Sequence, residues 1–335
     1  SDAVTRPQVT NLAFMKLNRI SITALIGVVL AGAAGLSYWG ASSREHVQTP
    51  IVDKGTPAPM AFSGLPASAR CDLYAQQIHA LGNHVAEKEQ TALAAWINSP
   101  KPAHLSNAAW HYLVNEIMSA LRHQEHPLPS LTDTLIGIAQ GQANDPTLRN
   151  YAIHHLGVWI QPTNLGVTCE TDPKKRQAII TTLLEAAKQY REDLSGTALL
   201  GLQIALMGRE RSEKQKEPYA RLSFPLTVEQ LRPIAVDLAT MGETPHSVRM
   251  TALQVCAQRG FAEILPVARR IAEDSKQPVV LRLSAIAAIG QVGGAEDQPL
   301  LEALQSQQEA PLLKAIVPAL KNIQERPIVS RTIST

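Results

Sequence analysis

The feature of this chain that most constrains its fold is an internal repeat of helix length. Residues 246–256 and 279–289 carry the same pattern of small, aliphatic and basic residues. The matching positions are Arg249 with Arg282 and Ala252 with Ala285, so the two copies are 33 residues apart. A fixed spacing of this size is typical of solenoids, in which each helix pair covers an apolar face of the next pair. The repeat therefore predicts an all-α protein.

Earlier copies of the pattern extend the repeat toward the N-terminus. Asp145, Pro146, Arg149 and Ala152 hold the same spacing, and Ala198 belongs to a weaker copy. The aspartate can cap a helix, and the proline fits the first helical turn, where no N–H bond is needed. Small alanines let neighbouring helices approach closely. We expect the arginine to pair within its own turn or with the next repeat.

The pattern resembles the HEAT-repeat family, in particular its short bacterial HEAT-like form. The resemblance is specific over residues 245–325, less so over 145–210 and only general over 70–140. It implies a right-handed α-solenoid of stacked antiparallel helix pairs, in which helix 146–160 pairs with helix 174–190. It also implies a partner bound along the concave surface and no catalytic residue, so the chain is expected not to be an enzyme.

Composition agrees with closely packed helices and argues against a nucleic-acid binder. Aromatic residues make up 4% of the chain, whereas sheet-based folds favour aromatic and β-branched residues. Lys and Arg number 31 against 29 Asp and Glu, which gives a formal net charge of +2. A nucleic-acid-binding domain usually has a basic excess or a basic stripe. We expect a protein partner, no nucleic acid and no small-molecule substrate.

The N-terminal part predicts export. Residues 1–14 are interpreted as a leader or a cloning remnant. Residues 15–43 are expected to form a signal-anchor or transmembrane helix, with residues 20–40 crossing the membrane. Lys16 and Arg19 precede the apolar run, which favours a single pass through the inner or cytoplasmic membrane with the solenoid on the periplasmic or extracellular side. A cleaved signal peptide, which leaves the rest secreted, is the alternative.

Three further segments complete the predicted organisation. Residues 44–66 contain closely spaced prolines and are expected to be an extended linker. Residues 67–326 form the HEAT-like α-solenoid, and residues 327–335 form a C-terminal tail. Within the solenoid, the alternating charges of residues 209–217 predict a solvated loop between two helices.

No catalytic or cofactor motif stands out. The sequence lacks a nucleophile elbow, a P-loop, a dinucleotide-binding fingerprint and a zinc-protease motif, so we expect no catalytic residue, no cofactor and no metal. Histidines are enriched from His104 to His155, and we interpret them as solvated or capping because further ligands of fixed geometry are missing. Cys71 and Cys169 are candidates for one disulfide in an oxidising compartment. Cys256 lies in an apolar helical pattern and is expected to be buried.

Two basic clusters are candidate interface residues. Lys174, Lys175 and Arg176 begin a helix, where cations are unfavourable to the helix dipole, so they could mark a contact with an acidic partner. Arg269 and Arg270 lie on a helix of the kind along which solenoids commonly bind. For both clusters the alternative is an ordinary solvated face.

These observations favour a membrane-tethered, exported scaffold or adaptor that binds a protein through the solenoid surface. Two alternatives stay open. An envelope glycan-binding module would stack sugars on Trp96, Trp110 and Trp159, although large aromatics in helices usually face the core. A lyase-type enzyme is the other alternative, since some HEAT-like proteins resemble lyases that act on bilin–protein bonds.

Overall fold

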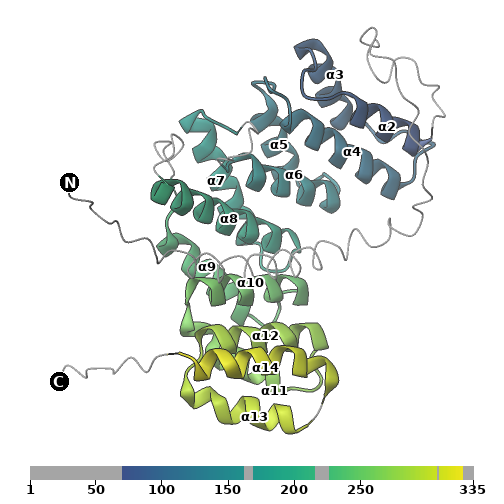
Figure 1. The fold of residues 1–335 in the computed structure, drawn as a ribbon. Helices are drawn as coiled ribbons and strands as arrows, with labels where there is room; N and C mark the ends of the chain where they lie inside the picture. The colour runs from purple at the N-terminus through teal and green to yellow at the C-terminus, as the bar shows by residue number, and fades with distance from the viewer. Residues whose placement is uncertain (1–69, 162–168, 216–225, 308, 327–335) are drawn as a thin grey trace, which may run out of the picture. The chain divides into compact units, whose positions relative to one another are not determined.

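The computed structural model describes residues 70–161, 169–215, 226–307 and 309–326, which belong to the compact unit Ala58–Thr335. In these residues every regular element is helical, with thirteen α-helices, two short 3₁₀-helices and no strand (Figure 1). The all-α class that the repeat predicts is confirmed, and the arrangement is consistent with an α-solenoid.

Most of the helices agree closely with the predicted ranges. Their bounds are α2 (Cys71–Ala80), α3 (Glu87–Ile97), α4 (Asn107–Arg122), α5 (Leu131–Gln140), α6 (Pro146–Trp159), α7 (Pro173–Ala187), α8 (Leu194–Gln215), α9 (Val228–Thr240), α10 (His246–Arg259), α11 (Leu265–Glu273), α12 (Val279–Val292), α13 (Gln298–Ser306) and α14 (Ala310–Gln324). The 3₁₀-helices η2 (Ala262–Ile264) and η3 (Ala295–Asp297) lead into α11 and α13.

Helix α8 departs from the prediction. The segment 209–217 was expected to be a loop, but the helix continues through it as far as Gln215. Arg209 Nε donates to Glu213 Oε1 at 2.6 Å, one helical turn further on. An opposite-charge pair at this spacing stabilises a helix, so the alternating charges here support helix rather than loop.

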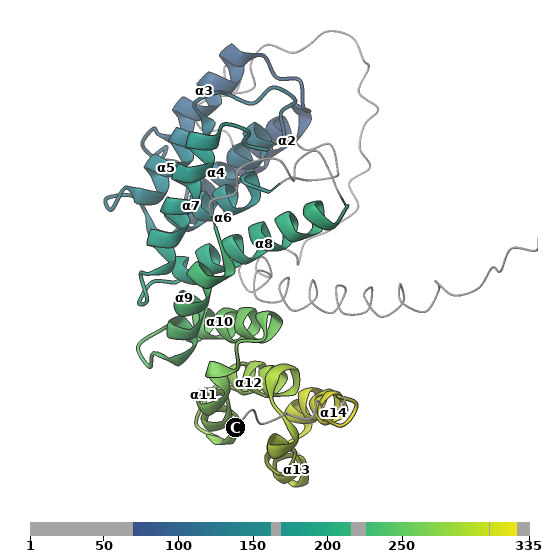
Figure 2. The same cartoon turned by 90° about the vertical axis from the view of Figure 1, so that its left-hand side faces the viewer.

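The helices form two layers (Figure 2). The even-numbered helices from α2 to α14 lie side by side, each in contact with the next even-numbered helix. The odd-numbered helices from α3 to α13 form the other layer, and each packs against the even-numbered helix that follows it. The repeating unit is therefore an odd helix followed by an even helix. The sequence-based pairing of 146–160 with 174–190 starts this unit one helix too late, although α6 and α7 also touch.

Local sequence explains several helix ends. The Asp145 carboxylate accepts a hydrogen bond from Thr147 N at 2.8 Å, and Pro146 occupies the first turn of α6. Asp172 caps α7 in the same way through Lys174 N. Helix α10 ends at Gly260, whose φ of 71° lies in the left-handed region that glycine adopts without strain.

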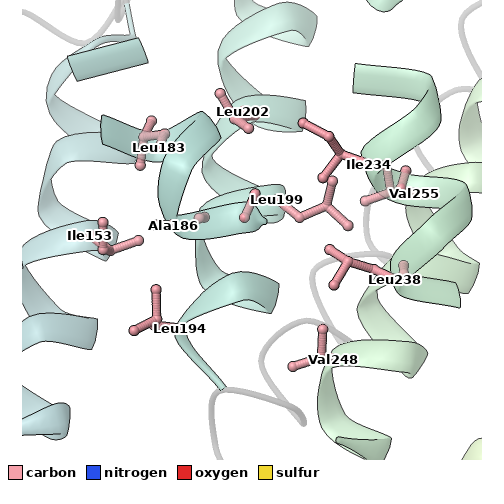
Figure 3. Close-up of a cluster of buried hydrophobic side chains, with 14 of the residues drawn as sticks. Ile153, Leu183, Ala186, Leu194, Leu199, Leu202, Ile234, Leu238, Val248 and Val255 are labelled. Carbon is pink, nitrogen blue, oxygen red and sulfur yellow. The ribbon is translucent and has the colours of Figure 1, made fainter. Parts of the chain in front are cut away.

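A continuous apolar core joins the two layers, and α8 lies in the middle of it (Figure 3). Leu199 and Leu202 of α8 are fully buried between Leu183 of α7 and Ile234 of α9. Each buried leucine stabilises the fold by about 1.5–3 kcal/mol relative to an exposed one. Because each helix pair shares its core with the next pair, the unit is held together by nearest-neighbour packing.

The predicted anchor of residues 15–43, the linker of residues 44–66 and the tail of residues 327–335 lie outside the described residues. In the part of the chain that the structure does describe, none of the helices has the length and apolar character needed to cross a membrane.

Candidate functional site

The candidate site lies along the turns that lead from each odd helix into the following even helix. We call this the turn edge, and it comprises residues 141–145, 188–193, 241–245 and 274–278. Neighbouring turns are bonded to one another: Arg191 Nε donates to Glu243 Oε2 at 2.8 Å. Asp193 also accepts a hydrogen bond from Ser247 Oγ of α10 at 2.7 Å. These bonds connect the two turns.

An open hollow of 720 Å³ lies between two of these turns, lined by residues 189–192 and 241–243. Tyr190 is half-buried against the core, and burial, with the charge of Asp237 adding to it, raises the pKa of its phenol. Met241 is 40% exposed, so its apolar side chain is accessible from solvent. The ion pair between Arg191 and Glu243 spans the same two turns and is largely exposed. The hollow therefore combines two apolar side chains with a charged rim.

A second, smaller hollow of 210 Å³ lies among α5, α6 and α7 and shares Gln189 with the first. Its other lining residues include Gln140, Ile153, Thr182 and Glu185. The two hollows therefore lie next to each other at the turn that contains Gln189.

Three buried arginines stand behind the turn edge, each in the first turn of an even helix. Each donates from Nε to the carbonyl ten residues earlier, near the end of the preceding odd helix: Arg149 to Ala139 at 3.1 Å, Arg249 to Ala239 at 3.4 Å and Arg282 to Ala272 at 3.1 Å. The repeat arginine therefore ties each even helix to the odd helix before it.

Two of these arginines also reach the following turn. Arg149 donates to Glu192 Oε2 and Gln189 Oε1, both at 3.1 Å. Arg282 donates to the two carboxylate oxygens of Glu309 at 2.8 and 3.4 Å. A guanidinium in this position links consecutive repeats and helps to position the residues that line the hollow.

The small residues of the repeat lie where helices meet. All four are fully buried, and they are Ala152, Ala198, Ala252 and Ala285. Their methyl groups leave room for neighbouring helices to approach, so the structure places these residues in packing rather than at a binding surface.

The first predicted interface cluster needs correction at one position. Arg176 is only 1% exposed and donates to the carbonyls of Ile160 and Glu170 at 3.1 and 2.8 Å, so a partner cannot reach it. Lys175 contacts the Pro129 carbonyl. Lys174 is exposed, and its backbone N–H is capped by Asp172.

The second predicted cluster is divided in the same way. Arg269 donates to the buried carboxylate of Asp297 and is only partly exposed. Arg270 is exposed and lies close enough to Arg249 for its positive charge to lower the pKa of that arginine, after the larger effect of burial. Of the two, Arg270 is the one that a partner can contact.

The histidine-rich segment forms no metal centre in the described residues, where no three His, Cys, Asp or Glu side chains could hold an ion. His155 is 3% exposed and lies 3.2 Å from the amide oxygen of Asn115. His123 lies 2.7 Å from the Ser119 carbonyl at the end of α4, and His111 pairs with Asp145 at 3.3 Å.

The three cysteines are free thiols. Cys71 Sγ lies 3.6 Å from the Ala109 carbonyl. Burial raises the pKa of the Cys169 thiol, and the positive charge of Arg176 partly offsets this increase. The structure therefore does not contain the candidate disulfide between Cys71 and Cys169. Cys256 is buried, as its apolar pattern predicts.

The tryptophans do not form a sugar-binding platform. Trp110 and Trp159 are each 4% exposed, and Trp159 donates to Thr132 Oγ1 at 3.0 Å. Trp96 is half-buried and packs on Trp110 with ring centroids 4.6 Å apart. The glycan-binding alternative depended on exposed indoles and loses its support.

Comparison with known proteins gives little that bears on function. No family model and no curated protein matches the chain. Among solved structures, one similar chain is human deoxyhypusine hydroxylase in complex with glycerol, with 13% sequence identity and a TM-score of 0.29. The match covers 78% of this chain and 93% of the hydroxylase. At this TM-score the likeness assigns neither an activity nor a ligand to this chain.

The comparison does correct one prediction. The chain was expected not to be an enzyme because its repeat motif is structural, yet the similar solved chain is a hydroxylase. The expectation that the chain is not an enzyme is therefore not supported.

Sequence reasoning missed the hollow. Tyr190 and Met241 stand in short turns among polar residues, and neither belongs to the repeat pattern. A large apolar side chain in a two- to six-residue turn is the signal that could have identified them, because connections are normally polar.

Proposed function

We propose that this chain is a HEAT-like helical repeat protein that binds a segment of another protein along the turn edge. The observation that carries the proposal is the 720 Å³ hollow, in which Tyr190 and Met241 offer apolar contact inside a charged rim. Aromatic residues and methionine are enriched at the centres of protein interfaces, where they act as anchors.

The shape and rigidity of the site support a protein segment as the ligand. The hollow is open and continues into a second one, so an extended chain fits it better than a compact small molecule that must be enclosed. The bonds from Arg149 to Glu192 and from Arg191 to Glu243 hold the turns in place before binding. Pre-organisation of this kind reduces the entropy lost on association.

In this proposal the solenoid works outside the cytoplasm. Residues 15–43 anchor it in the inner or cytoplasmic membrane, and residues 44–66 hold it away from the bilayer on the periplasmic or extracellular side. Secretion after cleavage of a signal peptide is the alternative. The near-neutral charge favours a protein partner over nucleic acid.

The experiment that tests the proposal compares variants of the tagged full chain in native membranes. Met241→Asp places a charge in the hollow and should abolish capture of the partner, as identified by mass spectrometry after gentle solubilisation. Val317→Asp is the matched control, because Val317 is 54% exposed on α14 and does not line the hollow.

The expected result is a protein captured by the wild type and by Val317→Asp but lost with Met241→Asp. Circular dichroism should show that both variants melt within about 3 °C of the wild type, since exposed substitutions change stability by about 0.5 kcal/mol or less. If every captured protein is retained by Met241→Asp, the hollow is not the binding site.

A further inference from the structure

The arginines behind the turn edge differ in one respect. Arg149 and Arg282 each meet a glutamate of the following turn, Glu192 or Glu309. Arg249 occupies the equivalent position in α10 but has no such partner. In the described residues the only hydrogen bond of its side chain is the one to the Ala239 carbonyl, and no carboxylate lies within ion-pair distance.

The sequence of the following turn explains the gap. Glu192 stands two residues before the start of α8, and the residue two before the start of α12 is Gln277. The Gln277 side-chain amide donates to Asp274 Oδ2 at 2.9 Å. Asp274 also accepts from Lys276 N at 3.0 Å, and its charge interacts with Arg282 rather than with Arg249.

Arg249 is nevertheless almost fully removed from water. It is 8% exposed, and burial followed by the nearby charge of Arg270 lowers the pKa of its guanidinium. Thr244, in the turn just before α10, is also buried, and its hydroxyl has no hydrogen-bond partner in the described part of the chain. A buried charge without a counter-charge is costly, so this position is prepared for an acidic group from elsewhere.

We propose that Arg249, assisted by Arg270, binds a carboxylate of the partner segment and completes the arginine–glutamate series that Gln277 interrupts. The chemistry is the same as at Arg149 and Arg282, where the guanidinium donates to a glutamate of the following turn. Residues 241–243 line the hollow and belong to the turn that leads directly into α10, in whose first turn Arg249 lies. A segment that places an apolar side chain in the hollow can therefore place an acidic residue at Arg249.

This inference rests on the proposed function for the origin of the carboxylate, but its test does not need the native partner. The probe is a fluorescein-labelled hexaglutamate peptide, with hexaglutamine as the uncharged comparison. Binding to the full chain in detergent is followed by fluorescence anisotropy at low salt, where charge interactions are least screened.

Gln277→Glu is the decisive variant, since it supplies an internal carboxylate at the position that Glu192 occupies in turn 188–193, two turns earlier on the turn edge. We expect it to weaken hexaglutamate binding about tenfold or more and to raise the melting temperature by about 2–4 °C. Arg249→Gln should weaken binding to a similar extent. Lys314→Gln removes one exposed charge on α14 and should change binding less than about twofold.

The inference is overturned if Gln277→Glu binds hexaglutamate as the wild type does, or if Lys314→Gln weakens binding as much as Arg249→Gln. The second result would show that hexaglutamate is attracted by the positive charge of the protein surface in general and not by a site at Arg249. Should Arg249→Gln fail to fold, Gln277→Glu alone decides the question. A negative result in the anisotropy experiment overturns only the role of Arg249. The capture experiment with Met241→Asp still decides whether the hollow binds a protein segment.

Discussion

Gly157 of α6 and Gly201 of α8 face each other where the two helices cross, and a Cβ built on Gly157 would lie 2.8 Å from the Cα of Gly201. Real Cβ atoms do not approach backbone so closely. Glycine within a helix normally costs about 0.5–1 kcal/mol relative to alanine, so this crossing is maintained at the expense of helix propensity.

We therefore expect Gly157→Ala to destabilise the chain by about 1–3 kcal/mol, because the backbones of α6 and α8 must move apart. Gly137→Ala in α5 is the matched control, since a Cβ there meets nothing within 4 Å. That variant should be neutral or stabilise the fold by up to about 1 kcal/mol. Urea unfolding measures both, and equal effects would show that the crossing is not close-packed.

The ion pair between Arg282 and Glu309 should contribute more to stability than the one between Arg191 and Glu243. The Arg282 side chain is 3% exposed, so Glu309→Ala leaves a buried charge without a partner and should cost about 1–3 kcal/mol. Arg191 and Glu243 are 77% and 69% exposed, and Glu243→Ala should cost less than about 1 kcal/mol. Thermal melting at low and high salt tests this, and a larger loss for Glu243→Ala would contradict it.

The repeat pattern was predictable because it depends on local spacing. Arg249 and Arg282 both bond to the carbonyl ten residues earlier, so the same short-range geometry recurs wherever the same residues recur. What the sequence could not supply was the second contact of Arg149 and Arg282, the glutamate in the following turn. Glu192 lies 43 residues after Arg149, and Gln277 gives no sign of its role until the turns are aligned in space.

Arg176 shows a prediction that closer attention to periodicity would have improved. It was grouped with Lys174 and Lys175 as a basic cluster, but it lies three, four and seven residues before Ile179, Ile180 and Leu183, which are all fully buried. Residues at these spacings share one helix face, so Arg176 belongs to the buried face of α7. The hollow formed by Tyr190 and Met241 had no such signal, because it arises from the packing of two turns whose residues Tyr190 and Met241 are 51 positions apart in the sequence.

Cysteine reactivity should follow burial in the folded chain. Cys256 is fully buried, and burial, with a contribution from Glu263, raises the pKa of its thiol to about 12. At pH 8 only about 10⁻⁴ of such a thiol is thiolate, which is the reactive form. Iodoacetamide should therefore modify Cys71 and Cys169 well before Cys256, as read by peptide mass mapping. In 8 M urea all three should react alike, and fast labelling of Cys256 without urea would show that α10 opens readily.

The stability of the helical unit should fall in mild acid because of His155. Burial, then the positive charges of His154, Arg122 and His123, hold the pKa of His155 well below its usual value of about 6.5, so the folded chain keeps this ring neutral. The unfolded chain binds a proton there once the pH falls below about 6.5, and stability is lost as the pH drops further, with a limiting slope of about 1.4 kcal/mol per pH unit for one proton.

His155→Gln removes the titrating group and retains a donor that can reach Asn115, so its urea-unfolding free energy should depend less on pH between 5 and 7. His126→Gln, at an exposed histidine, should keep the wild-type slope. Parallel curves for the wild type and His155→Gln would mean that another group controls the acid response.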